Sequence, residues 1–128
     1  MKDCRLTITT TVDGQETNVA RLGKMDIQPL GATLYYQEEN AYVTVHAHAN
    51  RVEIDRKGDY SMRLTFAENE LLSGTLGIGG NEGNLQTQTH RLAFSVTEHS
   101  FLLLLQYALI FSEEKQEMKI RISARENG

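Results

Sequence analysis

The chain has 128 residues, enough for one domain with a substantial core and too few for two ordinary domains. Hydrophobic residues make up 40% of it and charged residues 23%, a balance that excludes an intrinsically disordered protein. The net charge is −4 and the sequence contains no local cluster of lysine and arginine, which argues against nucleic acid as a partner.

Two strands joined by a tight turn are predicted at the start of the chain. Apolar and polar residues alternate from Cys4 to Val12, the period of a half-buried strand. Asp13-Gly14 follows, a pair that favours a type I′ hairpin because both of its residues take a positive φ. A second strand is expected from Thr17 to Gly23. Because Cys4 shares its parity with apolar residues, we expect a buried thiol and not an activated nucleophile.

Four strands are predicted in the middle of the chain, where apolar and polar residues again alternate. They cover residues 33–36, 41–48, 52–55 and 60–66. The carboxylate pair Glu38-Glu39 falls in a turn and is expected to be solvated. Arg56-Lys57-Gly58-Asp59 is the turn expected before residue 60, with Gly58 at a position that needs a positive φ.

Four more strands are predicted in the second half, over residues 71–76, 85–96, 101–111 and 118–124. Residues 77–83 are rich in glycine, and we expect a hairpin loop there. The apolar parity of the strand that follows changes at His90-Arg91, a one-residue slip that a β-bulge produces.

Residues 101–111 are open to two interpretations. Ser100 could cap a leucine-rich helix over this segment. We favour a strand, because the flanks lack an acidic third residue or a terminal glycine and all neighbouring segments are strands. In that case Leu102 and Leu104 point outward, and apolar residues on both faces suggest that a second subunit covers the outside.

About ten short strands predict an all-β fold, an antiparallel up-and-down β-barrel of about 8–10 strands that forms a single domain over residues 1–128. The longest apolar run, Phe101 to Phe111, is well short of the roughly 20 residues of a membrane helix, so we expect no membrane partner. The N-terminal residues lack the apolar stretch of a signal peptide, and a lone cysteine suits a reducing compartment. We therefore expect a cytoplasmic, soluble protein.

The whole segment Arg51 to Phe66, followed by Gly83-x-Leu85, Thr89 and Leu105-Gln106-Tyr107, resembles the YwiB-like bacterial proteins. This resemblance covers nearly the whole chain and rests on the order and spacing of short motifs. It implies a calycin-like, lipocalin-like barrel and brings no activity, because the family is a domain of unknown function. Two features depart from related patterns: residues 77–83 replace a tyrosine-containing turn, and the chain has no tryptophan for the Gly-x-Trp signature of true lipocalins.

The sequence does not support several familiar chemistries. His46 and His48 would share one face of a strand and could bind zinc or iron with His90 or Asp55, but their neighbours mark that face as solvated. Residues 77–83 do not have the spacing of a phosphate-binding loop. No Gly-x-Ser-x-Gly elbow or acid–base constellation is visible. We expect no enzyme, no metal and no cofactor.

Arg56 is the most informative single residue. It could close one end of the barrel by stacking on an aromatic ring and bonding to loop carbonyls, or it could clamp an anionic ligand, and we favour closure. The barrel is expected to bind a small apolar or amphipathic molecule inside, and the alternative is a structural or protein-interaction module with a packed interior that acts as a homodimer. The candidate ligand-binding residues are Arg56, Tyr60, Met62, Phe66, Thr89 and Tyr107.

Overall fold

Each strand of this protein pairs with the next strand along the chain, and the last pairs with the first. The computed structural model describes residues 1–127. Its strands are β1 (Lys2–Val12), β2 (Gln15–Gln28), β3 (Gly31–Glu38), β4 (Ala41–His48), β5 (Arg51–Gly58), β6 (Tyr60–Ala67), β7 (Leu71–Ile78), β8 (Asn81–Val96), β9 (Ser100–Phe111) and β10 (Glu114–Glu126). They close an antiparallel barrel, which confirms the predicted all-β class. No helix in the described residues is long and apolar enough to cross a membrane.

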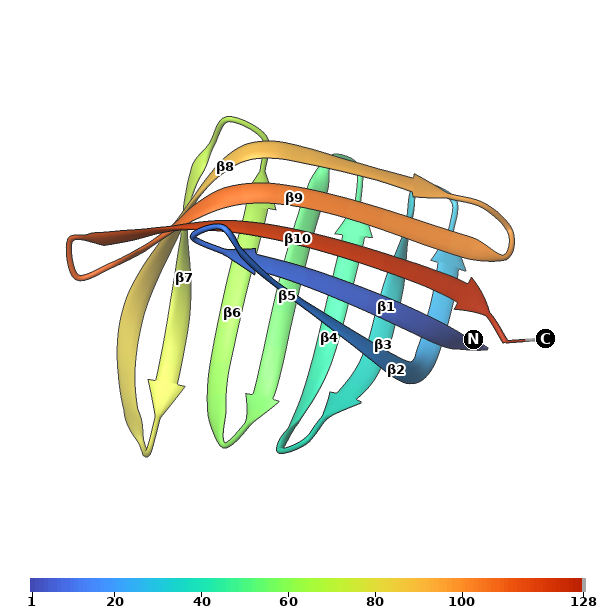
Figure 1. Cartoon of the computed structure of the whole chain (residues 1–128), viewed down its shortest axis with the longest axis horizontal. Helices are drawn as coiled ribbons and strands as arrows, with labels where there is room; N and C mark the ends of the chain where they lie inside the picture. Colours follow the sequence, from blue (N-terminus) through green and yellow to red (C-terminus); the bar gives the residue numbers. More distant parts are fainter. Residues whose placement is uncertain (128) are drawn as a thin grey trace.

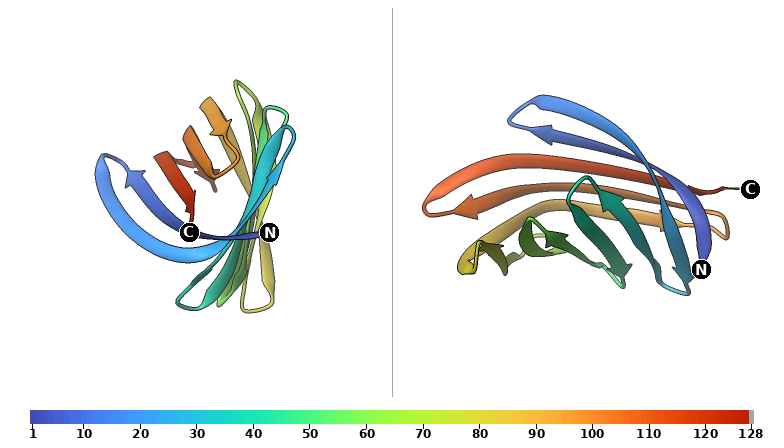
Figure 2. Two further views of the ribbon diagram at one scale, coloured as in Figure 1. Left: turned by 90° about the vertical axis from the view of Figure 1, so that its right-hand side faces the viewer. Right: turned by 90° about the horizontal axis from the view of Figure 1, so that it is seen from below.

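The barrel is flattened into two layers whose strands cross at a steep angle (Figure 1). Strands β8, β9, β10 and β1 form one layer, and β3 to β7 form the other. Two strands belong to both layers. The first part of β2 pairs with β1 and its end pairs with β3, while β8 pairs first with β7 and then with β9. Figure 2 shows β2 curving from one layer into the other.

The predicted irregularity in β8 is present. The register against β9 shifts between Thr89 and Arg91, which confirms the expected bulge. The backbone N–H of Leu92, just after the bulge, donates to the Glu68 carboxylate at 3.0 Å. The bulge increases the local twist of β8 and helps this strand to turn from one layer to the other.

Alternation of side chains along each strand fills the middle of the barrel. Phe101, Leu103 and Leu105 are buried, while Leu102 and Leu104 between them face outward and are half-buried, so residues 101–111 form the predicted strand and not a helix. Cys4 is buried as expected. Burial raises the pKa of its thiol, and the nearby Asp3 carboxylate raises it further. A thiol in this environment is not an activated nucleophile.

The turns agree with the sequence at one hairpin and differ at two others. Asp13 and Gly14 both have a positive φ, as expected for their hairpin. The predicted turn at residues 56–59 is wrong, because β5 continues to Gly58 and only Asp59 separates it from β6. Gly58 does not have a positive φ, so its predicted role is also wrong. The predicted loop at residues 77–83 is a two-residue turn at Gly79 and Gly80 between extended strands.

The border between β6 and β7 is the shortest in the barrel. It joins only four residue pairs, from Tyr60–Ile78 to Arg63–Thr75. Where β7 leaves β6, the Thr87 hydroxyl of β8 donates a hydrogen bond to the carbonyl of Thr65 at 2.6 Å. A side chain thus takes the place of a ladder hydrogen bond that β7 does not make.

Two buried threonines of β8 provide a matched test of this contact. Thr87→Val is expected to lower the free energy of unfolding by about 1–3 kcal/mol, because the Thr65 carbonyl loses its donor. Thr89→Val is expected to leave stability unchanged or raise it, because the buried Thr89 hydroxyl has no hydrogen-bond partner among the described residues. Urea denaturation followed by circular dichroism measures both, and equal losses in the two variants would contradict this account.

Candidate functional site

One end of the barrel interior is not filled by side chains. A cavity of about 180 Å³ lies there, which we call the inner cavity. Its apolar lining comes from Ile8, Val43, Ile54, Met62, Leu64, Met118, Ile120 and Ile122, and its polar lining from Thr10, Tyr36, Glu38, Arg56, Tyr60 and Tyr107. The lining therefore holds one cationic and one anionic side chain on an otherwise largely apolar surface.

A row of cross-strand neighbours forms one wall of the inner cavity. Tyr36 pairs with Val43, Val43 with Arg56, and Arg56 with Met62, across β3, β4, β5 and β6. These residues point inward because they continue the buried parity of their strands. Tyr107 of β9 contributes to the wall from the other layer.

Arg56 is held by four contacts at the end of the cavity. Its Nε donates to the Glu38 carboxylate at 3.2 Å, its Nη1 donates to the Tyr60 carbonyl at 2.7 Å, and its Nη2 lies 2.9 Å from Asp59 Oδ1. Its guanidinium carbon stands 3.6 Å from the centre of the Tyr60 ring. Stacking on an aromatic ring and bonding to a backbone carbonyl are the contacts expected of a residue that closes a barrel end.

The charges around Arg56 do not favour an anion clamp. One guanidinium faces two carboxylates, and the Arg56 side chain is only 10% exposed while those of Glu38 and Asp59 are 37% and 52% exposed. A bound anion would add a third negative group beside these two. The expectation that Glu38 is a solvated turn residue is wrong, because it lies on β3 and pairs with Arg56.

The ionisation of Asp59 makes the stability of the protein depend on pH. The hydrogen bond from Arg56 holds the pKa of the Asp59 carboxyl below its ordinary value of about 3.9, so folding favours the ionised form. Its contribution to stability is complete above that ordinary pKa and is lost as the pH falls through the folded-state pKa. Asp59→Asn is therefore expected to reduce the loss of stability on acidification below about pH 4. Urea midpoints between neutral and acidic pH measure this, and Glu39→Gln, at an exposed neighbouring carboxylate, is the control.

The Tyr107 side chain brings a hydroxyl to the inner cavity. Tyr107 is 1% exposed and lines the inner cavity, and its hydroxyl makes no hydrogen bond to any described residue. Its ring packs edge-on against Phe66 at a centroid distance of 4.6 Å. Burial raises the pKa of Tyr107, so the hydroxyl stays a neutral donor. Burial also raises the pKa of Tyr36, the Glu38 carboxylate adds to the shift, and Arg21 opposes it.

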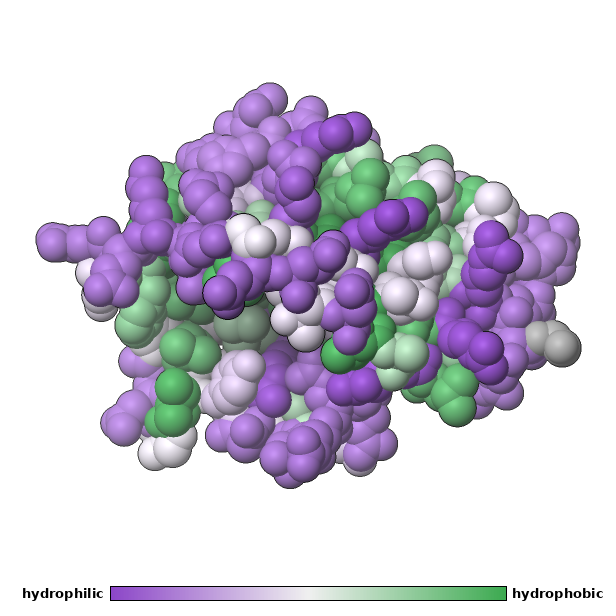
Figure 3. Space-filling view, in the orientation of Figure 1, coloured by the Kyte–Doolittle hydropathy of each residue, from purple (hydrophilic) through white to green (hydrophobic). Residues whose placement is uncertain are grey.

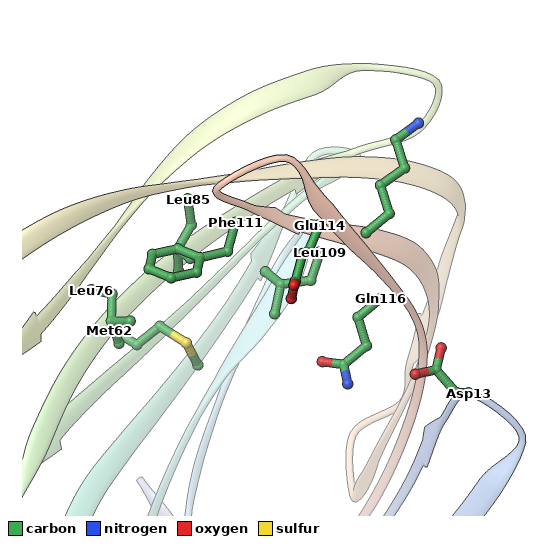
Figure 4. A pocket seen from close by; sticks show the side chains of 9 residues that line it. Asp13, Met62, Leu76, Leu85, Leu109, Phe111, Glu114 and Gln116 are labelled. Carbon is green, nitrogen blue, oxygen red and sulfur yellow. The ribbon is translucent and has the colours of Figure 1, made fainter.

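The inner cavity adjoins a groove that is open to solvent, which we call the entrance groove. It measures about 390 Å³ and is lined by Asp13, Met62, Leu76, Leu85, Leu109, Phe111, Glu114, Lys115 and Gln116. Figure 4 shows apolar side chains including Met62, Leu76 and Phe111 on one side, and Asp13 and Gln116 on the other. Met62 lines both spaces. In Figure 3 the same end of the molecule is hollowed below β10.

The register connects the two spaces along β9 and β10. Tyr107 pairs with Met118 in the inner cavity, and Leu109 pairs with Gln116 one inward position further, in the entrance groove. Successive inward positions of a strand line one continuous surface. The two spaces therefore lie next to each other along the same strands.

The structure brings four of the six predicted site residues together. Arg56, Tyr60, Met62 and Tyr107 line the inner cavity. Phe66 and Thr89 lie behind it in the closed core, Phe66 against the Tyr107 ring and Thr89 opposite Tyr107 on the neighbouring strand. Sequence reasoning missed Tyr36, Glu38 and Met118, although Tyr36 and Glu38 share the parity of the buried Leu34.

The histidine pair lies on the outside of the barrel. His46 and His48 are exposed, as predicted, and their rings are parallel with centroids 6.2 Å apart. The Thr33 hydroxyl lies 2.7 Å from His46 Nδ1. Within residues 1–127 no group of three or more histidine, cysteine and acidic side chains is placed to hold a metal ion.

Basic side chains gather on the outer face of the layer formed by β8, β9, β10 and β1. We call this the basic face, and its cations are Arg5, Arg91, Lys119, Arg121 and Arg125. All five are exposed, and none forms an ion pair within the described part of the chain. The sequence contains no run of basic residues, but strand pairing brings cations from three strands together. Figure 3 shows this layer facing the viewer, with hydrophobic residues gathered over β8 and β9.

Comparisons with known proteins place the chain in a structural context. A family model described as Domain of unknown function (DUF1934) matches residues 4–122. No curated protein matches the chain. A crystal structure of the YwiB protein from Bacillus subtilis is similar with a TM-score of 0.85 and 16% identity, covering 99% of this chain and 93% of that one. At this identity the similarity shows the fold alone, and it confirms the predicted calycin-like barrel.

Proposed function

The chain belongs to the DUF1934 family of domains of unknown function, and since no activity comes with that membership, we propose from its own geometry that the barrel binds a small amphipathic molecule in the inner cavity. The role is binding and not catalysis, because both carboxylates near the cavity, Glu38 and Asp59, are held by Arg56. The lone cysteine, buried and reduced, suits a cytoplasmic location.

The observation that carries this proposal is the unpaired Tyr107 hydroxyl at the wall of a cavity. Among the described residues the fully buried side-chain oxygen without a partner is Thr89 Oγ1, so the Tyr107 hydroxyl is still reached by solvent in the cavity. An acceptor on a ligand would satisfy this hydroxyl. The cavity of about 180 Å³ is also large enough for one ring, because an apolar cavity of about 150 Å³ binds benzene. The entrance groove gives the rest of such a ligand a place to lie.

The methionines allow a direct test. The protein labelled with ¹³C at its methionine methyl groups is titrated with 4-propylphenol, a neutral amphipathic probe, and followed by NMR. The methyl signals of Met62 and Met118 are expected to shift, because both residues line the inner cavity. Met25, which is buried outside the cavity, is the internal control. Absence of shifts at Met62 and Met118, or equal shifts at Met25, would overturn the proposal.

Removal of the hydroxyl tests the observation itself. Tyr107→Phe is expected to weaken binding of 4-propylphenol about 2- to 10-fold, the effect of one neutral hydrogen bond. Tyr42→Phe is the matched control, because the Tyr42 side chain is exposed on the outside of the barrel. Equal affinities of the Tyr107→Phe variant and the native protein would mean that the hydroxyl does not contact the probe.

A protein-interaction role is the second candidate, and the outward-facing Leu102 and Leu104 favour it. These half-buried leucines lie among the cations of the basic face. A homodimer through this face remains a prediction, and two-fold symmetry would place like charges opposite each other. Such a dimer should therefore strengthen as salt rises from ~0.01 M to ~1 M, where the screening length falls from about 30 Å to about 3 Å. Sedimentation velocity at both concentrations tests this, and a monomer throughout would exclude the dimer.

A further inference from the structure

The Arg56–Glu38 pair keeps hydrogen-bonding groups that the protein does not use. A guanidinium has five N–H donors, and three of those of Arg56 are directed at Glu38, Asp59 and the Tyr60 carbonyl. One N–H on each terminal nitrogen remains. Glu38 receives Arg56 on Oε2, while its Oε1 contacts no hydrogen-bond donor among the described residues. The end of the inner cavity thus offers donors and an acceptor side by side.

The charges of the lining limit what can occupy this position. Arg56 and Glu38 are the two ionised side chains that line the inner cavity, and Arg56 also pairs with Asp59 outside that lining. An anionic head would bring a third negative charge near Glu38, and a cationic head would lie against Arg56. Either charge would also leave water for a mostly apolar surface. A neutral head that both donates and accepts hydrogen bonds avoids these penalties.

The remaining lining suits an apolar body. Met62 and Met118 present flexible thioethers, which adapt to irregular shapes and contact aromatic rings favourably. The Tyr107 hydroxyl adds one donor. A carboxamide or lactam has an N–H donor beside a carbonyl acceptor in one plane, which complements the neighbouring Arg56 and Glu38 groups.

We infer that the ligand of the inner cavity is a neutral amide, a carboxamide or lactam attached to an aromatic or branched apolar group, with its amide on the Arg56–Glu38 pair. This inference rests on the proposed function and specifies the chemical class of the ligand. It differs from the alternative of an anion clamp at Arg56, which the sequence left open beside the favoured closure of the barrel end, because Glu38 takes part in the recognition.

Three probes with one ring and different heads test the inference. These are 3-phenylpropanamide, 3-phenylpropanoate and 3-phenylpropylamine, each titrated into the methionine-labelled protein. The amide is expected to bind about tenfold more tightly than either charged probe, because a charged head would be buried without an adequate partner. Comparable or tighter binding of the acid or the amine would overturn the inference and leave the proposed function standing. No shift of Met62 and Met118 with any of these probes or with 4-propylphenol would overturn the proposed function itself.

Substitution at Glu38 gives an independent readout. Glu38→Gln removes the negative charge from the lining and leaves Arg56 paired with Asp59. The affinity for 3-phenylpropanoate is then expected to rise about tenfold relative to the affinity for 3-phenylpropanamide. Glu39→Gln, at the exposed adjacent residue, should leave the ranking unchanged. An unchanged ranking in a folded Glu38→Gln variant would show that Glu38 does not select the head group, and if that variant does not fold, the ranking in the native protein decides the question.

Discussion

Arg56→Ala is expected to lower the free energy of unfolding by about 2–3 kcal/mol. The variant leaves Glu38 and Asp59 without their cation, removes the donor to the Tyr60 carbonyl and uncovers the Tyr60 ring. Removal of one partner from a fully buried ion pair costs about 3–5 kcal/mol, and the lower figure here reflects the partial exposure of both carboxylates. Urea denaturation at neutral pH, followed by circular dichroism, measures the change.

Arg63 provides the matched control. It is also an arginine on the β3–β7 layer with two carboxylate partners, Glu53 at 3.6 Å and Asp55 at 3.1 Å, but its side chain is 56% exposed. Arg63→Ala is expected to cost much less than Arg56→Ala, because exposed ion pairs contribute little to stability. Arg56→Lys should fall between the two alanine variants, because it keeps the charge and loses the planar fork. Equal losses for Arg56→Ala and Arg63→Ala would show that Arg56 does not hold the barrel end together.

Gly58→Ala is expected to destabilise the protein by at least about 2 kcal/mol, because the added methyl group has no space. A Cβ at this position would lie 2.0 Å from the Asn40 carbonyl oxygen and 2.6 Å from the Ala41 Cβ. That carbonyl cannot move freely, since it accepts a hydrogen bond from the Asp59 N–H at 3.1 Å. The shift would also disturb the strand that carries Arg56. The midpoint and slope of urea denaturation measure the loss in the free energy of unfolding.

Gly77→Ala separates this steric effect from a general effect of glycine. Gly77 also lies in a strand without a positive φ, and its nearest neighbours to an added Cβ are 3.9 Å away. The substitution is expected to leave stability unchanged or to raise it by up to about 1 kcal/mol, since alanine restricts the unfolded chain. A similar loss in both variants would mean that the close approach at Gly58 does not control the fold.

Much of the fold could be predicted because a two-residue period directly reports which side of a strand is buried. Alternation located the strands, the parity change at His90-Arg91 located the bulge, and Asp13-Gly14 located a turn. The same rule, followed further, would have placed Arg56 inside, because Val52 and Ile54 share its parity. Its charge and the following glycine instead suggested a turn. A buried arginine is stable here because Glu38 and Asp59 meet it, and the contact with Glu38, on another strand, is not visible in the local sequence.

The candidate site and the basic face depend on contacts between distant segments. Tyr107 reaches the inner cavity from β9, more than sixty residues after Tyr36 of β3. Arg5 and Arg91 share the basic face only because β1 pairs with β10, β10 with β9 and β9 with β8. Strand register over such separations follows from closure of the barrel, which no local pattern encodes.

The short border between β6 and β7 determines where this barrel is expected to open locally. With four residue pairs it has the fewest ladder contacts to separate, so the local opening of lowest free energy is expected to part these two strands. Met62 and Leu76 face each other across that border, and both line the entrance groove. Opening of the β6–β7 border and entry of a ligand would then be the same motion. A ligand that bridges Met62 and Leu76 would slow amide hydrogen exchange along β7.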